Sequence, residues 1–179
     1  MNDFVRVAIS GKSGCGNTTV SRLLADTLKV EFINYTFRMM AEEQGVSFEE
    51  MARMAEEDDK WDRYLDNRQV EEARRGSCVL ASRLAIWLLK GEADLTVYLR
   101  ASREVRAARI HRREGGDYQE TLRHTEARDR RDRARYLRLY EIDIDDWEFA
   151  DLVIDTEQYL PEEIERVVVQ ELERRRSRG

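Results

Sequence analysis

The residues with the clearest chemical signature form a glycine-rich segment near the start of the chain. Gly11, Gly14 and Gly16 stand directly after an apolar run and directly before a stretch with helical spacing. Glycine permits backbone conformations that other residues avoid, so successive backbone N–H groups can turn toward an anion. The start of the following helix adds the positive end of its dipole. With Thr18 at the Ser/Thr position of the pattern, this spacing predicts a phosphate-binding loop.

The loop departs from the usual pattern at the position of its lysine. The chain has Asn17 there, which can donate a neutral hydrogen bond but carries no charge. Charge-assisted hydrogen bonds are roughly twice as strong as neutral ones, so another cation is needed. We expect Lys12, at the mouth of the loop, to turn its ammonium inward, although a solvated loop charge accounts for this lysine equally well. The Thr18 hydroxyl is the candidate ligand for Mg²⁺ shared with nucleotide phosphates.

Cations converge on this loop from two further strand ends. Phosphoryl transfer gathers several negative charges and therefore needs cations from more than one element. Arg38 follows the second apolar run of the chain, and Arg83 directly follows the third. Ligands of open α/β sheets bind at the carboxyl ends of parallel strands, which is where both arginines are expected.

A third source of positive charge is the arginine-rich segment 109–135, whose composition is typical of a mobile charged cover. We expect four of its arginines to serve the site: Arg109, Arg113, Arg128 and Arg133. A solvated helix face with ion pairs between residues four apart accounts better for Arg130, Arg131 and Arg135. The basic end of the chain, 174–178, is likewise expected to be a solvated helix end.

The elements that must position these residues follow from the alternation of short apolar runs with longer helical stretches. The runs predict strands over 5–9, 31–34, 78–81, 95–99 and 152–154. The helical stretches are 18–28, 37–43, 48–57, 63–74, 103–113, 118–140 and a last helix opened by Pro161. Such alternation predicts an α/β fold with a parallel sheet and right-handed crossovers, in one domain over 1–179.

Composition narrows the function classes. The 179 residues carry a net charge of −6, whereas a dedicated nucleic-acid binder is usually basic. The longest apolar stretch, 84–89, is too short for a membrane span. The two cysteines have no spacing typical of a zinc site, so a reducing cytoplasm is the expected compartment.

The chain resembles nucleoside monophosphate kinases, and most closely cytidylate kinases of the compact archaeal type. The segments that carry the resemblance are SGKSGCGNTTVSRLLAD, the FR of NYTFRMMAEEQGVSFEEM, AEEDDKWDRYLDNRQVEEARRGSCVLASRLAIWLL, ADLTVYLRASREVRAARIHRRE and ARDRRDRARYLRLYEIDIDDWEFADLVIDT. The resemblance implies a P-loop NTPase fold: a five-stranded parallel sheet flanked by helices, a helical monophosphate-binding insertion at about 35–75 and an arginine-rich lid at about 113–135. It implies phosphoryl transfer from ATP to CMP or dCMP with Mg²⁺, by a cytoplasmic monomer whose partners are small-molecule nucleotides rather than nucleic acid or membrane.

The resemblance also implies a role for each candidate residue. The ATP phosphates would be held by Gly11, Lys12, Ser13, Gly14, Cys15, Gly16, Asn17, Thr18 and Thr19. Arg109 would flank adenine, Arg113 would reach the ATP phosphates, and Arg128 and Arg133 would neutralise the transferring group, with Asp132 orienting them. Arg38 and Arg83 would hold the CMP phosphate, and the cytosine pocket would be built from Asp62, Asp66, Arg68 and Gln69. An exposed helix face is nearly as good an account of Asp62 and Asp66.

Two further departures from the family pattern leave alternatives open. Tyr35 and Thr36 occupy a segment where an Asp is common, and Ala81 and Ser82 stand where an acidic residue and glycine are common. One alternative is a P-loop kinase for another nucleotide or a small metabolite. The other is a catalytically impaired nucleotide-binding regulatory module, favoured by Asn17.

Overall fold

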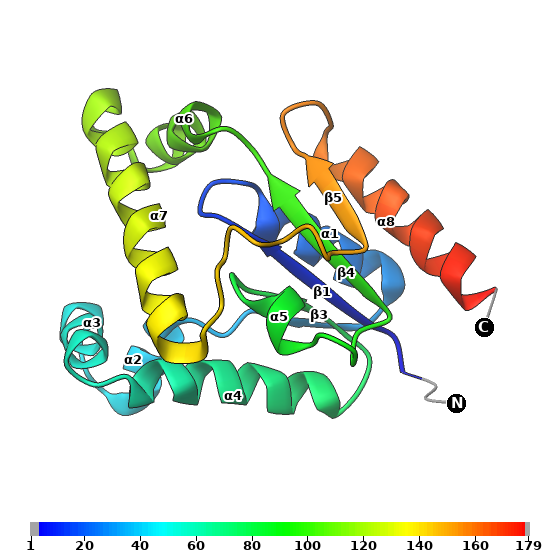
Figure 1. The fold of residues 1–179 in the computed structure, drawn as a ribbon, viewed down its shortest axis with the longest axis horizontal. Helices are drawn as coiled ribbons and strands as arrows, with labels where there is room; N and C mark the ends of the chain where they lie inside the picture. The colour runs from blue at the N-terminus through cyan, green and yellow to red at the C-terminus, as the bar shows by residue number, and fades with distance from the viewer. Residues whose placement is uncertain (1–3, 178–179) are drawn as a thin grey trace.

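The computed structural model describes residues 4–177 and places a single parallel sheet at the centre of the molecule (Figure 1). The order of its strands is β2-β3-β1-β4-β5. Their bounds are β1 Arg6–Gly11, β2 Glu31–Ile33, β3 Cys78–Ala81, β4 Leu95–Arg100 and β5 Leu152–Asp155. The expected α/β sheet is therefore confirmed, with each strand within two residues of its predicted bounds.

The three inner strands are buried because both of their faces are apolar. In β1, Val7 pairs with Val79 of β3 on one side and with Leu95 of β4 on the other. All six residues of β1 and all four of β3 are buried, whereas the edge strands β2 and β5 are only partly so. Continuous apolar runs are typical of parallel strands covered by helices on both faces, and this is the pattern seen here.

Within residues 4–177, eight helices connect and cover these strands. Their bounds are α1 Asn17–Leu28, α2 Phe37–Gln44, α3 Phe48–Glu57, α4 Lys60–Arg74, α5 Ala85–Leu88, α6 Arg103–Glu114, α7 Tyr118–Tyr140 and α8 Pro161–Arg176. The predictions for α3 and α7 match at both ends, and α4 begins three residues earlier than expected. The short helix α5 was not expected from the sequence, because its four residues lie inside a continuous apolar run with no helical spacing.

Two apolar cores hold the helices against the two faces of the sheet. One core joins Val20 and Leu24 of α1 to Ile164 and Val168 of α8 across the buried side chains of the inner strands. The other lies on the opposite face, where α4, α5 and the segment 147–150 cover the sheet. A smaller core around Tyr35, Met40 and Met51 packs α2, α3 and α4 together.

The carboxyl ends of the strands face the helical hairpin of α6 and α7. In Figure 1 the arrowheads of β1, β4 and β5 point toward these helices, and the last turns of α7 lie beside α3 and α4. Side-chain caps begin both helices, since the hydroxyl of Ser102 accepts from the N–H of Val105 and the carboxylate of Asp117 accepts from that of Glu120. Residues of α7 and of the α2–α4 unit line one cleft together with the loop that follows β1.

Candidate active site

The glycine-rich segment forms a tight loop between β1 and α1. Gly14 and Gly16 have φ angles of 84° and 94°, in the left-handed region that glycine adopts at little cost. Gly14 also lies against α6, where a Cβ would come within 2.7 Å of the carbonyl oxygen of Arg106. Gly16 caps α1 without any side-chain hydrogen bond, so the first N–H groups of the helix are free of a side-chain cap. The backbone thus has the form of an anion-binding turn.

Asn17 does not replace the missing lysine, because its side chain is engaged in hydrogen bonds within the protein. Its amide Nδ2 donates to the carbonyl oxygens of Ile9 and Ser82, at 3.2 and 3.4 Å, and its Oδ1 accepts from the hydroxyl of Ser21 at 2.9 Å. These bonds join the ends of β1 and β3 to α1. The positive charge that phosphates require must therefore come from other residues.

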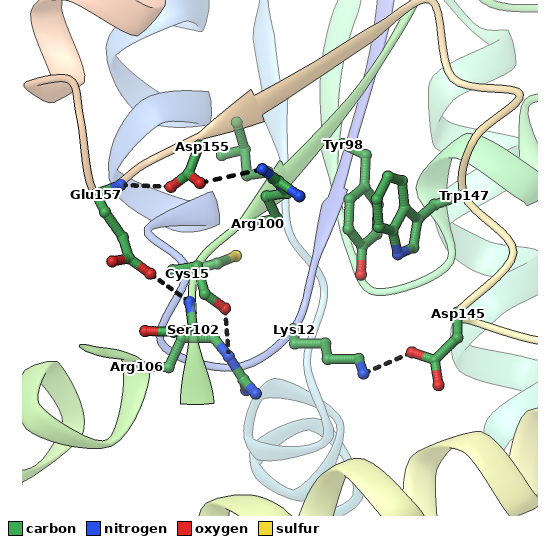
Figure 2. Close-up of a pocket in the computed structure, with 12 residues that line it drawn as sticks. Lys12, Cys15, Tyr98, Arg100, Ser102, Arg106, Asp145, Trp147, Asp155 and Glu157 are labelled. Atoms are coloured by element: carbon green, nitrogen blue, oxygen red, sulfur yellow. Dashed lines mark hydrogen bonds and ion pairs between the residues drawn. The ribbon is translucent and has the colours of Figure 1, made fainter. Parts of the chain in front are cut away.

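Lys12 lies at the mouth of the loop and pairs with a carboxylate. Its Nζ is 2.5 Å from Oδ1 of Asp145, and about a quarter of its side chain, 26%, is exposed. Lys12 lines a cleft of about 740 Å³ that includes the whole glycine-rich loop except Cys15. It also lines a second cavity of about 500 Å³, formed with Tyr98 and Trp147, which Figure 2 shows together with the pair to Asp145.

Two arginines of α6 hydrogen-bond to the backbone of the loop. Arg106 is buried; it donates to the carbonyl oxygen of Ser13 at 3.1 Å and makes two bonds, of 3.1 and 2.6 Å, to the carboxylate of Asp129. Arg109 donates to the carbonyl oxygen of Gly14 and to both the hydroxyl and the carbonyl of Thr156. Arg106 was not identified from the sequence, because nothing in its spacing distinguishes it from the other arginines of α6.

A partly buried charge cluster connects the loop to α7. The Arg83 guanidinium is 2.8 Å from Oδ2 of Asp132, and Arg128 donates to the hydroxyl of Ser13 at 3.3 Å. Burial, with a contribution from nearby Arg83, lowers the pKa of Arg128. The carboxylate of Asp132 thus pairs with Arg83, and Arg128 places a second guanidinium group beside the phosphate-binding loop. Such an excess of positive charge favours an anion.

Tyr136 belongs to the same cluster and was not identified from the sequence. It lines the cleft, and burial raises the pKa of its phenol to about 12. Arg128, Asp132 and Tyr136 are four residues apart along α7, which places all three on one face of the helix. That spacing is the signal that could have identified Tyr136.

The wall of the cleft opposite the loop comes from α2 and α4. Arg38 lines the cleft with its guanidinium carbon 4.8 Å from the centre of the Phe48 ring. Gln69 is 1% exposed and donates through Nε2 to the carbonyl oxygen of Tyr35 at 2.7 Å. Its Oε1 is buried and has no hydrogen-bond partner within the described residues. A buried acceptor without a partner is costly to leave unsatisfied, so it marks a place where a ligand donor would bind.

Asp66 lies one helical turn before Gln69 and lines the same cleft. Its Oδ2 accepts from the hydroxyl of Tyr140 at 2.7 Å. Burial raises the pKa of this carboxyl from its ordinary 3.8 to about 6. Asp62 and Asp66 are only 4% and 7% exposed, so the exposed-face account of these two residues is wrong.

Five of the candidate residues lie outside the cleft lining: Cys15, Asp62, Arg68, Asp132 and Arg133. Asp62 is bound by Arg135 and lines a separate cleft of about 860 Å³ between α3, α4 and α7. Arg68 stacks on the Tyr35 ring at 4.0 Å and pairs with glutamates at 2.5 and 3.1 Å, so its charge is already neutralised. Arg133 makes two bonds to Asp143, at 2.8 and 2.6 Å.

Several expectations about the arginines of α7 need correction. Asp132 pairs with Arg83, whereas Arg133, which it was expected to orient, pairs with Asp143. Arg135 is not part of a solvated face, because it donates to buried Asp62 and to a backbone carbonyl of α3. The solvated account fits Arg130, which pairs with Glu126 four residues earlier.

Ion pairs partly neutralise the basic end of the chain where the structure describes it. At the basic end of the chain, Arg174 and Arg175 pair with Glu171, while Arg178 lies outside the described residues. Within residues 4–177, no three His, Cys, Asp or Glu side chains gather in a group that could hold a metal ion. None of the helices in that range is both long and apolar enough to cross a membrane.

Solved structures with similar folds include a shikimate kinase and a gluconokinase. A shikimate kinase from Bacteroides thetaiotaomicron superposes with a TM-score of 0.61 at 18% identity, over 94% of this chain and 98% of that one. A gluconokinase from Sinorhizobium meliloti superposes with a TM-score of 0.59 at 17% identity, over 97% and 94% of the two chains. These likenesses show that the chain has the P-loop kinase fold.

Sequence relatives are closer. Cytidylate kinase 2 of Borreliella burgdorferi is 48% identical over 175 residues, which cover 96% of this chain and 97% of the relative. The cytidylate kinase of Pyrococcus horikoshii is 40% identical over 168 residues, covering 93% and 87% of the two chains. Residues 6–158 match the model of the cytidylate kinase-like family. With the phosphate-binding loop and its surrounding arginines in place, the chain belongs to the cytidylate kinase-like family.

Proposed function

We propose that the chain transfers the γ-phosphoryl group of ATP to CMP or dCMP, releasing ADP and CDP or dCDP. Relatives at 40% and 48% identity are cytidylate kinases, and nearly the whole chain aligns with them. The cleft offers what two nucleotides need: a backbone anion site at one end and a buried acceptor wall at the other. In this proposal α2, α3 and α4 form the acceptor-binding region, about 35–75, and the segment 113–135 acts as the lid.

The donor half of the site is built by the loop. Its N–H groups and the start of α1 would hold the ATP phosphates, and Arg109 and Arg113, which line the cleft, would meet the rest of the nucleotide. Thr18 also lines the cleft and offers a hydroxyl. Mg²⁺ keeps several waters and needs only one or two protein groups, so Thr18 together with nucleotide phosphates fits it. When bound, the ion would neutralise charge that develops between the β and γ phosphates.

The transfer step needs positioning and charge stabilisation rather than a covalent intermediate. An oxygen of the acceptor phosphate forms the new bond to the γ phosphorus as the bond to the β-phosphate bridging oxygen breaks. Arg38 and Arg83 would hold the acceptor phosphate, and Arg128, already in contact with the loop, would stabilise the equatorial oxygens. Since Asn17 carries no charge and is hydrogen-bonded into the fold, these arginines have a larger share of that stabilisation.

The observation that carries the choice of base is the unpaired Oε1 of Gln69. Cytosine presents an amino group, N4–H₂, and two acceptors can share its two protons. Gln69 Oε1 and the Asp66 carboxylate stand one turn apart on α4 and both line the cleft. Uracil presents a carbonyl oxygen in place of the amino group, which would leave both acceptors unpaired. The wall therefore favours cytosine over uracil.

A panel of monophosphates tests this function. Purified protein is given Mg²⁺, ATP and CMP, dCMP, UMP or AMP, and ADP formation is measured for each. We expect kcat/KM for CMP and dCMP to exceed that for UMP by at least about a hundredfold, since a site built to hydrogen-bond a group strongly rejects the analogue lacking it. A preference for UMP or another acceptor would contradict the proposal, and tight ATP binding without turnover of any monophosphate would point to a regulatory module.

A pair of variants on α4 connects the preference to Gln69. Gln69→Leu removes the acceptor at similar size and should lower kcat/KM for CMP by about tenfold or more, with little effect on UMP. Asn67→Ala, on the exposed face of the same helix, is the matched control and should leave both values unchanged. An equal loss for CMP and UMP would assign Gln69 a purely structural role.

A further inference from the structure

The phosphate-binding loop has a cation that the usual pattern does not contain, and a carboxylate from a distant segment holds it. Asn17 is committed to β1, β3 and α1 through three hydrogen bonds. Lys12 is the lysine of the loop, and its Nζ lies 2.5 Å from Asp145, which follows α7 by five residues. The position of this ammonium is therefore decided by the loop that contains Asp145.

That loop is itself firmly anchored to the sheet. Trp147, two residues after Asp145, stacks on Tyr98 of β4 with ring centres 5.0 Å apart and planes at 9° (Figure 2). Phe149 packs edge-on against Trp87 at 5.6 Å. The N–H of Asp145 donates to Oδ1 of Asp143 at 3.0 Å, which fixes the turn between the two carboxylates. Asp145 is thus held in place from both sides.

The same two carboxylates also hold a cation of the lid helix. Arg133 of α7 makes two bonds to Asp143, and its Nε lies 3.4 Å from Oδ2 of Asp145. Asp145 therefore stands between a lysine from the loop and an arginine from α7. The approach of α7 and the placement of Lys12 are connected through one side chain.

We propose that Asp145 is a positioning residue that places the Lys12 ammonium for the phosphates of ATP and so supplies the charge missing at Asn17. This inference rests on the proposed kinase function. An ammonium has three donors, and the pair with Asp145 uses one of them, which leaves two for phosphate oxygens. A lysine otherwise loses considerable rotamer freedom when it binds, and a preformed ion pair reduces that loss. Lys12 still lines the cleft and keeps part of its side chain exposed, so the pair does not withdraw it from the ligand.

A double-mutant cycle between Lys12 and Asp145 tests this assignment. We expect Lys12→Met to lower kcat about a hundredfold and Asp145→Asn to lower it about tenfold, with KM for CMP changed by less than about twofold. In the Lys12→Met background, Asp145→Asn should change kcat by less than about twofold, because the carboxylate then has no ammonium to place. Asp145→Glu, which retains the charge, should recover part of the loss.

Matched measurements separate positioning from stability. Glu92→Gln breaks the exposed ion pair between Glu92 and Arg74, two residues that do not line the cleft. This variant should leave kcat unchanged. Thermal unfolding of each variant identifies any that fail to fold. Additive losses in the cycle would overturn the inference and give Asp145 a structural role. A rise in kcat for Asp145→Asn alone would also overturn it, because the carboxylate would then withdraw Lys12 from the phosphates.

The cycle is repeated with ATP binding measured by calorimetry, which needs no acceptor. We expect Asp145→Asn to weaken ATP binding about fivefold when Lys12 is present and by less than about twofold when it is not. If the wild-type protein binds ATP but phosphorylates no monophosphate, the proposed function fails while this cycle still decides the role of Asp145. If turnover is normal and the binding cycle is additive, only the inference about Asp145 fails.

Discussion

The two halves of the cleft are built by different means. The loop half is made of backbone: glycines with positive φ, a start of α1 that has no side-chain cap, and close packing against α6. The half formed by α2, α4 and α7 is made of side chains whose charges are partly neutralised by each other, such as Arg83 with Asp132. A site made of backbone tolerates few substitutions and does not discriminate between acceptors. A site made of side chains can discriminate between acceptors, and its groups can be substituted one at a time.

The largest effect is expected where the backbone half is altered. In Gly14→Ala the new methyl group would meet the Arg106 carbonyl, and the positive φ would add strain. We expect ATP binding, measured by calorimetry, to fall below detection. Gly91→Ala is the matched control: its φ is 79° and no atom lies within 4 Å of the added Cβ. It should cost about 1 kcal/mol of stability and leave ATP binding intact. Equal losses of ATP binding in the two variants would mean that reduced stability, not the contact of residue 14 with α6, explains the effect.

The next largest effect is expected at Arg128, where the two halves meet. Arg128→Gln removes a cation that contacts Ser13 of the loop, and kcat should fall about a thousandfold with KM values changed much less. Arg130→Gln, two residues along α7, removes an exposed arginine that pairs within its own helix and should leave kcat within about twofold. Steady-state kinetics with ATP and CMP measures both. A comparable loss at Arg130 would mean that the general charge of α7, not the contact of Arg128, is what matters.

A smaller effect, on stability, is expected at Asp66. Folding raises the pKa of this carboxyl from 3.8 to about 6, so the folded state favours the protonated form and loses stability as pH rises through about 6. Relative to Asp66→Asn, which cannot ionise, the wild-type free energy of unfolding should fall by about 2 kcal/mol between pH 4 and pH 8. Urea unfolding followed by circular dichroism at the two pH values measures the difference. Parallel pH profiles for the two proteins would refute the shift.

The smallest effect is expected at an arginine that the fold has already neutralised. Arg68 stacks on Tyr35 and pairs with Glu43 and Glu72, so Arg68→Met should change KM for CMP by less than about twofold. Arg38→Met, which removes a cation that lines the cleft, should raise KM for CMP about tenfold and also lower kcat. The ratio of the two effects, from CMP titrations, shows how far the side-chain half depends on where an arginine points. Equal effects would place Arg68 in the acceptor site.

How far the sequence predicts each half follows from the same difference. The loop and the strands were predictable because glycine spacing and apolar runs are local, and the inner strands need no polar face. Three features could not be predicted, because each depends on residues far away in the chain. They are the buried role of Arg106, the unpaired oxygen of Gln69 and the pairing of Asp132 with Arg83. The exposed-face account of Asp62 failed for that reason, since its partner Arg135 is 73 residues away. Helix α5 was not predicted because four consecutive apolar residues show no helical periodicity.

The stack of Trp147 on Tyr98 has a practical consequence. It places an indole two residues from Asp145 and beside the cavity that Lys12 lines, so the emission of Trp147 is sensitive to any rearrangement there. The chain has two other tryptophans, Trp61 and Trp87. Replacing both with phenylalanine would leave one intrinsic optical reporter at the junction of the loop, α7 and the sheet. Nucleotide arrival could then be followed in real time without any attached dye.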